Sequence, residues 1–374
     1  MSFTLAIDAM GGDLGVSMII PGTELALTKT QVKGLRFLLY GDAPAIEKAL
    51  EDAPLLRACS EVIHTDVIVT NYTKPAVAVR SGRKSNLGMA IDAVRDGRAH
   101  AVVSAGNTGA YMALSKVLLK TLDGINRPAI PAVMPTTNRH GRTIVLDLGA
   151  NIECSSLNLV QFALMGEAFA AKVFNIDRPT VGLLNVGSEE LKGHAGVQEA
   201  FQLLRGIPNL NFHGFVEGDD IMAGTTDVVV TDGFSGNIAL KAIEGTTRFV
   251  RHLLHDCMSS SWRGKLGYLI AKPAFDRVKQ VSDARYYNGA VFLGLRHIAV
   301  KSHGGTDAIG FANAVGVAIN MVKSNFIESV QARLTLLQTQ QEQIKREQAE
   351  QAESLNNMPS VEQNLDEAKK QEQI

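Results

Sequence analysis

Short apolar runs alternate along most of the chain with longer segments in which apolar residues recur at helical spacing. The short runs are rich in β-branched residues and are interpreted as buried parallel strands: Leu5–Ile7, Phe37–Leu39, Ala101–Val103, Ile144–Leu146, Val181–Leu184, Val228–Val230 and Ile298–Val300. The longer segments are interpreted as helices: Leu87–Val94, Ala110–Leu119, Leu157–Val173, Val197–Leu204, Ile238–Leu254 and Phe311–Val322. This alternation predicts an α/β fold, an αβα sandwich around a mostly parallel sheet.

The composition narrows the class of protein. A chain of 374 residues allows two or three domains or one large α/β unit. The 37 Lys and Arg residues balance 38 Asp and Glu residues, so no basic field for nucleic acid is expected. Three distant cysteines suit a reducing compartment. The chain start has no basic segment of a signal peptide, and no apolar run is long enough to cross a membrane, so we expect a soluble cytoplasmic protein of enzyme size.

The last part of the sequence differs from the rest. Residues 338–374 contain 9 Gln and 12 charged residues among 37, with no aromatic residue and few aliphatic ones. Such a segment cannot bury enough apolar area to offset the entropy of ordering. We interpret residues 1–337 as the α/β domain and residues 338–374 as a solvated tail, disordered or helical.

Small and polar residues follow each predicted strand, at the end where ligands of open parallel sheets bind. Glycines let backbone amides approach a ligand, and the helix N-terminus that follows attracts anions. The best candidate is the loop after Ala101–Val103, in which Asn107 or Thr108 is also placed to cap the next helix. The predicted phosphate-binding residues are Ser104, Gly106, Asn107, Thr108 and Gly109, with Gly11 and Gly12 from the first loop.

Common catalytic fingerprints are absent from the sequence. Neither the Gly-x-Gly-x-x-Gly spacing nor a Walker loop occurs, and Gly233–Asn237 lacks the spacing of a nucleophile elbow. Cys154 is interpreted as a core cysteine, and His252 and His255 lack a third metal ligand. The carboxylates that end strands are expected to accept loop N–H groups rather than form a catalytic pair; they are Asp8, Asp147 and Asp232. No metal and no cofactor are predicted.

Two further side chains are candidates for chemistry at strand ends. Lys192 lies in the loop Gly187–Gly193, between two glycines, where its ammonium could reach an anion. His303 lies in Ser302–Gly305 directly after a predicted strand. Both residues are therefore placed at the predicted ligand-binding edge.

Residues 259–279 interrupt the α/β pattern and are interpreted as an inserted helical hairpin. Trp262, Leu266, Leu269 and Ile270 stand there among basic residues, as in segments that lie on anionic lipid. The same pattern also suits a hairpin that packs on a second subunit. The residues by themselves leave these two interpretations equal.

Several spaced motifs resemble those of one family. They are Asp8–Asp13, Ser104–Ala110, Arg127–Ala129, Leu146–Asn151, Leu183–Gly187 with Lys192-Gly193, Asp232–Asn237, Tyr287–Gly294 and His303-Gly304. They occur in the order found in the phosphate acyltransferase (PlsX) family, over roughly residues 3–325. One departure is Asn86, at a position where relatives often carry serine.

The resemblance implies a Rossmann-like fold related to phosphotransacetylases and to isocitrate and isopropylmalate dehydrogenases. It implies transfer of a long-chain fatty acyl group from acyl carrier protein to inorganic phosphate, giving acyl phosphate for phosphatidic acid and phospholipid synthesis. It also implies a homodimer at the inner face of the cell membrane, with a glycerol-3-phosphate acyltransferase downstream. This favours the lipid-facing interpretation of residues 259–279. The positions similar to the active-site lysine and asparagine of the family are Lys192 and Asn237.

The expected mechanism combines these residues. Lys192 and the amides of Gly106–Gly109 would hold phosphate, Asn237 would donate to the tetrahedral oxyanion, and His303 could protonate the leaving thiolate. Three rivals remain: a phosphotransacetylase-like enzyme that uses coenzyme A, a dehydrogenase of the isocitrate type, and a non-catalytic membrane scaffold. The dehydrogenase needs a carboxylate cluster and several arginines that the sequence does not offer. A phosphate-induced rise in melting temperature would exclude the scaffold.

Overall fold

The computed structural model describes residues 3–30, 32–281 and 283–335, so the tail predicted over residues 338–374 lies outside the described residues. The chain divides into two units, Met1–Gln331 and Ala332–Ile374. All named strands and helices belong to the first unit. The strands form two sheets, whereas the sequence pattern predicted one.

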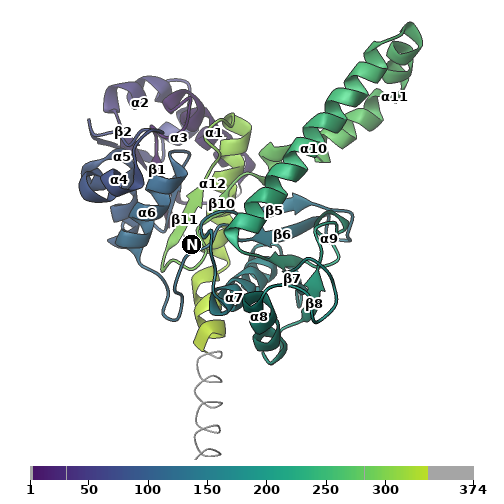
Figure 1. Ribbon diagram of the computed structural model, residues 1–374. Helices are drawn as coiled ribbons and strands as arrows, with labels where there is room; N and C mark the ends of the chain where they lie inside the picture. Colours follow the sequence, from purple (N-terminus) through teal and green to yellow (C-terminus); the bar gives the residue numbers. More distant parts are fainter. Residues whose placement is uncertain (1–2, 31, 282, 336–374) are drawn as a thin grey trace, which may run out of the picture. The chain divides into compact units, whose positions relative to one another are not determined.

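The first sheet has six strands in the order β10-β11-β4-β1-β2-β3 (Figure 1). All neighbours run parallel except the edge pair β10 and β11. The bounds are β1 Phe3–Asp8, β2 Leu35–Gly41, β3 Ser60–His64, β4 Ala101–Ser104, β10 Ala290–Val291 and β11 Ile298–Lys301. The central strands β4 and β11 are buried along their whole length, as their continuous apolar runs predict.

The second sheet has five strands in the order β5-β6-β9-β7-β8, parallel except for the edge pair β5 and β6. The bounds are β5 Ala132–Pro135, β6 Arg142–Leu146, β7 Val181–Leu184, β8 Phe212–Val216 and β9 Val228–Val230. All seven predicted strands are therefore confirmed. The unpredicted ones, β3, β5, β8 and β10, are the edge strands of the two sheets. Polar residues interrupt the apolar run in β3 and β8, and β10 has only two residues.

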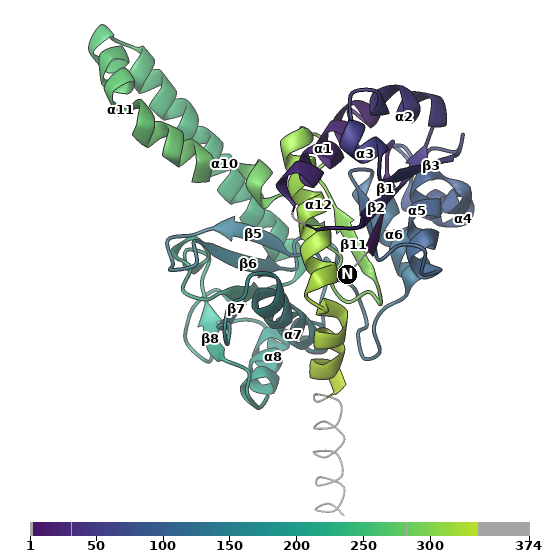
Figure 2. The ribbon, with the colours of Figure 1, turned by 180° about the vertical axis from the view of Figure 1, so that it is seen from behind.

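Helices cover both faces of each sheet. On the first sheet α5 and α6 pack with β4 on one face, and α1 and α12 lie on the other (Figure 1). On the second sheet α7 and α8 cover one face, and the start of α10 covers the other (Figure 2). The bounds are α1 Val16–Lys29, α2 Ala43–Leu50, α3 Pro54–Arg57, α4 Pro75–Ser81, η1 Gly82–Lys84, α5 Asn86–Arg95, α6 Thr108–Leu119, α7 Ser156–Val173, α8 Ala195–Arg205, α9 Asp220–Ala223, α10 Gly233–Ser259, α11 Trp262–Val281, η2 Ala284–Tyr287 and α12 Ala308–Lys323.

The inserted hairpin is longer than predicted. Its two arms are α10 and α11, which run side by side away from the sheets (Figures 1 and 2). The predicted segment 259–279 supplies the turn and most of the second arm, whereas α10 supplies the first. Only Gly233 and Gly236 of α10 are buried, and none of residues 262–278 is. Among the residues described, no helix is long and apolar enough to span a membrane.

Candidate functional site

The loops that follow β1, β4 and β11 meet at one edge of the first sheet, because these strands are neighbours and parallel. A Cβ atom on Gly11 would lie 2.6 Å from the amide nitrogen of Gly106, so the two loops touch through their backbones. Gly12 has φ +83°, and its Cβ would lie 3.0 Å from the carbonyl oxygen of Gly304. The predicted Gly11, Gly12, Gly106 and the loop of His303 are thus brought together.

The buried carboxylate of Asp8 is hydrogen-bonded to the loops at this edge. Asp8 is 1% exposed and accepts hydrogen bonds from Ser104 Oγ at 2.6 Å, from Asn86 Nδ2 and from the Met10 amide at 3.2 Å. Burial raises the pKa of Asp8 above its ordinary value, against the lowering effect of these donors. The prediction that Asp8 accepts loop N–H groups is confirmed.

Ser104 shapes the loop rather than pointing out of it. Its side chain is fully buried, and Oγ accepts from the Gly106 amide at 3.0 Å while donating to Asp8. Asn107 is the cap of α6, accepting from the Ala110 amide at 3.0 Å. The first turn of α6 therefore presents the backbone of Thr108 and Gly109, both exposed, as groups that an anion could approach.

Lys301, the last residue of β11, is a charged group that the sequence analysis missed. Its side chain is only 8% exposed, and Nζ donates to the carbonyl oxygen of Ala105 at 3.2 Å and to that of Ser302. Burial lowers the pKa of Lys301 to about 8, although Asp8 and Asp13 favour the ammonium. Since Ser104 holds the amide of the same 105–106 peptide, that peptide is fixed at both ends. The available signal was a lysine directly after an apolar strand run.

His303 is exposed at the same edge. Its Nδ1 accepts from the Gly305 amide at 3.1 Å, and its own amide donates to Asn288 Oδ1 at 2.9 Å. A neutral imidazole whose Nδ1 accepts carries its proton on Nε2. The loop therefore turns His303 so that Nε2 is the free position for a donor to a ligand.

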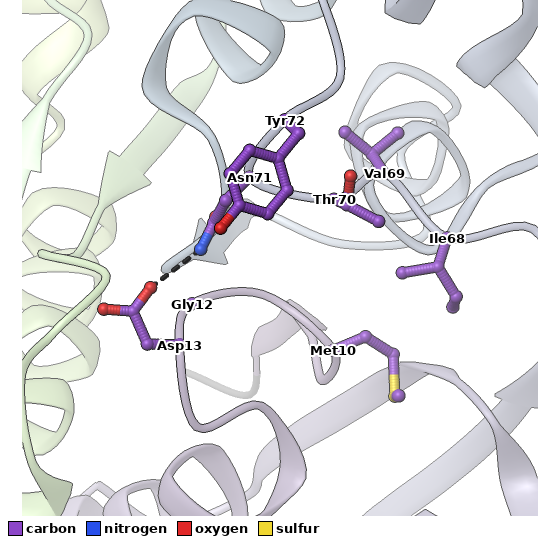
Figure 3. Close-up of a pocket in the computed structure, with 8 residues that line it drawn as sticks. All are labelled: Met10, Gly12, Asp13, Ile68, Val69, Thr70, Asn71 and Tyr72. Atoms are coloured by element: carbon purple, nitrogen blue, oxygen red, sulfur yellow. Dashed lines mark hydrogen bonds between the residues drawn. The ribbon is translucent and has the colours of Figure 1, made fainter.

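A pocket of about 460 Å³ opens beside this edge (Figure 3). One wall is the β1–α1 loop, with Met10, Gly12 and Asp13, and the other is the segment 68–72. Asn71 Nδ2 donates to Asp13 Oδ1 at 2.7 Å and joins the two walls (Figure 3). The volume lies within the range of about 300–1,000 Å³ typical of small-molecule sites. The sequence analysis did not identify this pocket.

A second group of polar residues lies at the carboxyl edge of the second sheet. Asp147, fully buried after β6, accepts from the amides of Ile130 at 2.8 Å and Asn151 at 2.6 Å and from Asn151 Nδ2 at 3.0 Å. Burial raises the pKa of Asp147 above its ordinary value. Asp232 caps α10 by accepting from the Ser235 amide at 2.7 Å. Asp147 therefore accepts loop N–H groups, as predicted, whereas Asp232 accepts an N–H group of the first turn of α10.

Asn237 and Lys192 belong to this second edge. Asn237 lies in the first turns of α10, exposed, and a Cβ on Gly149 would lie 3.7 Å from its own Cβ. Lys192 is exposed in the loop after β7, and within the described residues its ammonium makes no ion pair. No hydrogen bond or ion pair recorded among the described residues joins these two side chains to the loops of the first sheet. The predicted site residues therefore follow strands of two different sheets.

Cys154 lies close to the second edge, where its side chain is half-buried. Burial raises the pKa of its thiol to about 11, with Asp147 adding to the effect. A thiol with this pKa is protonated at neutral pH and reacts poorly. The half-buried position differs from the buried core cysteine that was predicted.

The comparisons with known proteins identify the family. The family model described as "Fatty acid synthesis protein" matches residues 3–329. A phosphate acyltransferase of Rhodospirillum centenum is 52% identical over 337 residues, covering 90% of this chain and 94% of the relative. One from Azorhizobium caulinodans is 52% identical over 330 residues, covering 87% and 92%.

Solved structures show the fold. A phosphotransacetylase from Streptococcus pyogenes matches with a TM-score of 0.57 at 18% identity, covering 86% of this chain and 94% of that chain. The EutD phosphotransacetylase from Staphylococcus aureus matches with a TM-score of 0.55 at 16% identity, covering the same shares. The relation to phosphotransacetylases expected from the sequence is confirmed at the level of the fold. By sequence, the chain belongs to the phosphate acyltransferase family and is an acyltransferase.

Proposed function

We propose that this enzyme transfers a long-chain fatty acyl group from acyl carrier protein to inorganic phosphate, giving acyl phosphate for phosphatidic acid and phospholipid synthesis. The observation that carries the proposal is the identity of about one half to proteins named phosphate acyltransferase, over nearly the whole length of both chains. The edge of the first sheet supports it, because an exposed helix N-terminus suits an anionic acceptor.

The chemistry needs little acid–base help from the protein. A phosphate oxygen bonds to the thioester carbonyl carbon, the carbon–sulfur bond breaks, and the thiolate leaves. The proton of hydrogen phosphate passes to that thiolate, and the Nε2–H group of His303 would donate a hydrogen bond to the leaving sulfur. Phosphate esters have a pKa of about 6 for their second ionisation, and inorganic phosphate is likewise a charged nucleophile at neutral pH.

The proposed roles combine residues at the carboxyl edges of both sheets. The loops with Gly11, Gly12 and the residues Ser104–Gly109 would hold phosphate, with contacts from the backbone of Thr108 and Gly109. Lys192 would add a cation, and Asn237 would donate a hydrogen bond to the oxyanion of the tetrahedral intermediate. Ser104 and Asn107 would act through the loop that they hold.

The hairpin suits a peripheral contact with the inner face of the cell membrane. Trp262, Leu266, Leu269 and Ile270 share one face of α11 by their spacing, and their exposed fractions are 71%, 50%, 67% and 75%. Apolar side chains at such exposure favour an apolar partner, and the neighbouring basic residues favour anionic lipid. A groove of about 760 Å³ between α10 and α11 would remain for the second copy of a homodimer. A downstream glycerol-3-phosphate acyltransferase would take up the product at the membrane surface.

The test is acyl phosphate formation, trapped with hydroxylamine, from purified enzyme, phosphate and a long-chain acyl carrier protein. Parallel reactions use the coenzyme A thioester, the variants Asn237→Ala and Lys192→Ala, and the control Asn320→Ala, an exposed residue of α12. We expect product from the carrier-protein donor and a loss of roughly 10²–10³-fold in kcat for Asn237→Ala. Turnover with coenzyme A alone would overturn the proposed donor, and full activity of both site variants would overturn their roles.

The membrane contact has its own test. Flotation with vesicles of anionic lipid should recover the wild-type enzyme and not the double variant Leu269→Ser/Ile270→Ser. The double variant Val77→Ser/Val79→Ser removes exposed apolar side chains of α4 and is the control. Equal recovery of all three proteins would rule out this face of α11 as the contact.

A further inference from the structure

One stretch of the chain beside the first edge carries only positive charge. Residues 67–91 contain Lys74, Arg80, Arg83 and Lys84 and no Asp or Glu, in a chain whose formal net charge is −1. All four side chains are exposed, at the cap of α4, in its last turn and in η1. We call these four residues the α4 basic surface. Such a local concentration of one sign attracts a partner of opposite charge.

The fold neutralises only one of these cations. Arg83 donates from Nε to Asp92 Oδ2 at 3.1 Å. Among the residues that the structure describes, Lys74, Arg80 and Lys84 take part in no recorded ion pair or side-chain hydrogen bond. Their charges are therefore available to a partner.

Apolar side chains stand among the cations. Tyr72 is 95% exposed, Val77 51% and Val79 37%. Tyrosine and arginine are enriched in protein–protein interfaces, and cations paired with carboxylates supply their charge complementarity. With two exposed valines, α4 offers less apolar area to a lipid surface than α11 does. The mixture of side chains therefore favours an acidic protein as the partner.

The α4 basic surface adjoins the proposed phosphate site, because α4 packs on α6 (Figure 1). Asn107, the cap of α6, donates from Nδ2 to the carbonyl oxygens of Asn71 at 2.7 Å and Thr73 at 3.1 Å. A Cβ atom on Gly109 would lie 3.0 Å from Cγ of Pro75, the first residue of α4. The segment that leads into α4 is thus held against the start of α6. A protein bound on this surface lies beside the loops to which a thioester must be delivered.

We infer that the α4 basic surface docks the acidic carrier protein that delivers the acyl thioester. Arg80 and Lys84 pair with carboxylates of the carrier, and Tyr72 and Val77 cover apolar side chains between those pairs. Among the substrates of the proposed reaction, only the carrier protein is large enough to contact all of these residues. The inference rests on the proposed function and adds the place where the donor protein binds.

The test measures kcat and KM for acyl phosphate formation from long-chain acyl carrier protein. The variant Arg80→Glu/Lys84→Glu reverses two charges that make no recorded contact in the described part of the chain. The control Lys33→Glu/Arg36→Glu makes the same change of charge at exposed positions near the start of β2, at the opposite edge of the first sheet. We expect the Arg80/Lys84 variant to raise the KM for the carrier-protein donor roughly tenfold at low salt, with little change in kcat.

The salt dependence is a second part of this measurement. The difference between wild type and the Arg80/Lys84 variant should shrink as added salt approaches about 1 M, where the Debye length is about 3 Å. If the KM for the carrier-protein donor and its salt dependence match those of wild type, this surface does not dock the carrier.

Other donors and ligands identify what the cations bind. The KM for the coenzyme A thioester and the phosphate-induced rise in melting temperature should be unchanged in the Arg80/Lys84 variant. A change in either equal to that for the carrier protein would show that the cations bind phosphate groups, and would overturn the inference. A loss of flotation with anionic vesicles, with an unchanged KM for the carrier protein, would assign the surface to lipid instead.

Direct binding separates the inference from the proposed function. The fluorescence anisotropy of labelled acyl carrier protein should give a Kd that is roughly tenfold weaker for the Arg80/Lys84 variant and unchanged for the control. If this difference appears but no donor yields acyl phosphate, the docking assignment stands and the proposed reaction fails. If acyl phosphate forms and all three proteins bind the carrier equally, the reaction stands and the docking assignment fails.

Discussion

Replacing Lys301 by methionine removes a buried charge from beneath the loops proposed to hold phosphate while keeping a side chain of similar length. The lowering of its pKa from 10.5 to about 8 corresponds to about 3 kcal/mol against the ammonium in the folded protein. Methionine removes that cost. It also leaves the carbonyl oxygens of Ala105 and Ser302 without this donor, at about 1–3 kcal/mol each. The effects partly offset, so we expect the free energy of unfolding near pH 7 to change by no more than about 3 kcal/mol.

The pH dependence gives the sharper result. Below about pH 8 Lys301 is charged in both states, so the wild-type protein bears the full cost of burying the ammonium. Between about 8 and 10.5 the unfolded chain binds more protons than the folded one, and wild-type stability must rise with pH. By about pH 9.5 the wild type should gain about 2 kcal/mol relative to Lys301→Met.

Urea unfolding near pH 7 and near pH 9.5 measures this difference, with Lys323→Met, an exposed lysine of α12, as the control. If the difference in unfolding free energy between wild type and Lys301→Met does not change with pH, the pKa of Lys301 is not lowered by burial of its ammonium. The same variant should raise the KM for phosphate more than it lowers kcat, because the 105–106 peptide loses one of its two anchors. Lys301→Arg should recover part of that loss, as it retains a donor to Ala105.

Three further predictions follow from single contacts. Asn86→Ala should lower the free energy of unfolding by about 2–4 kcal/mol in urea titrations, because Asp8 loses a donor and the Val69 amide its acceptor; a change below about 0.5 kcal/mol would contradict this. Gly11→Ala places a methyl group 2.6 Å from Asp8 and should abolish the phosphate-induced rise in melting temperature, and a normal rise would show that the loops can separate. Iodoacetamide should modify the exposed Cys257 well before Cys154 in peptide mass spectra, since burial raises the pKa of Cys154 to about 11, and the reverse order would disprove that account.

Local pattern was sufficient for seven of the strands, for the helices predicted between them and for several polar roles. A strand buried on both faces must be a continuous apolar run, so β4, β6, β7, β9 and β11 could be located from sequence. An aspartate or asparagine before a helix has few uses other than capping, which Asp232 and Asn107 confirm. These features depend only on residues that are close in the sequence, so the residue pattern predicts them.

Strand pairing was beyond the reach of the pattern. The same seven apolar runs fit one sheet or two, because a run shows that a strand is buried but not which strand lies beside it. The split into two sheets places Lys192 and Asn237 after strands of one sheet and the loops of Gly11 and Gly106 after strands of the other. The hairpin was underestimated for a related reason: α10 continues a helix that begins on the sheet, so its outer part looked like an ordinary covering helix.

The sequence by itself determined the α/β class, the family, and the strand-end loops where chemistry is placed. Only the tertiary structure decided which of those loops meet, that Lys301 and Asn86 lie buried beneath them, and that segment 68–72 forms a pocket beside them. The physical reason is that a buried polar side chain must find its partner across the fold. The Asn86–Asp8 hydrogen bond spans 78 residues and the Lys301–Ala105 bond spans 196, distances along the chain over which no local periodicity carries information.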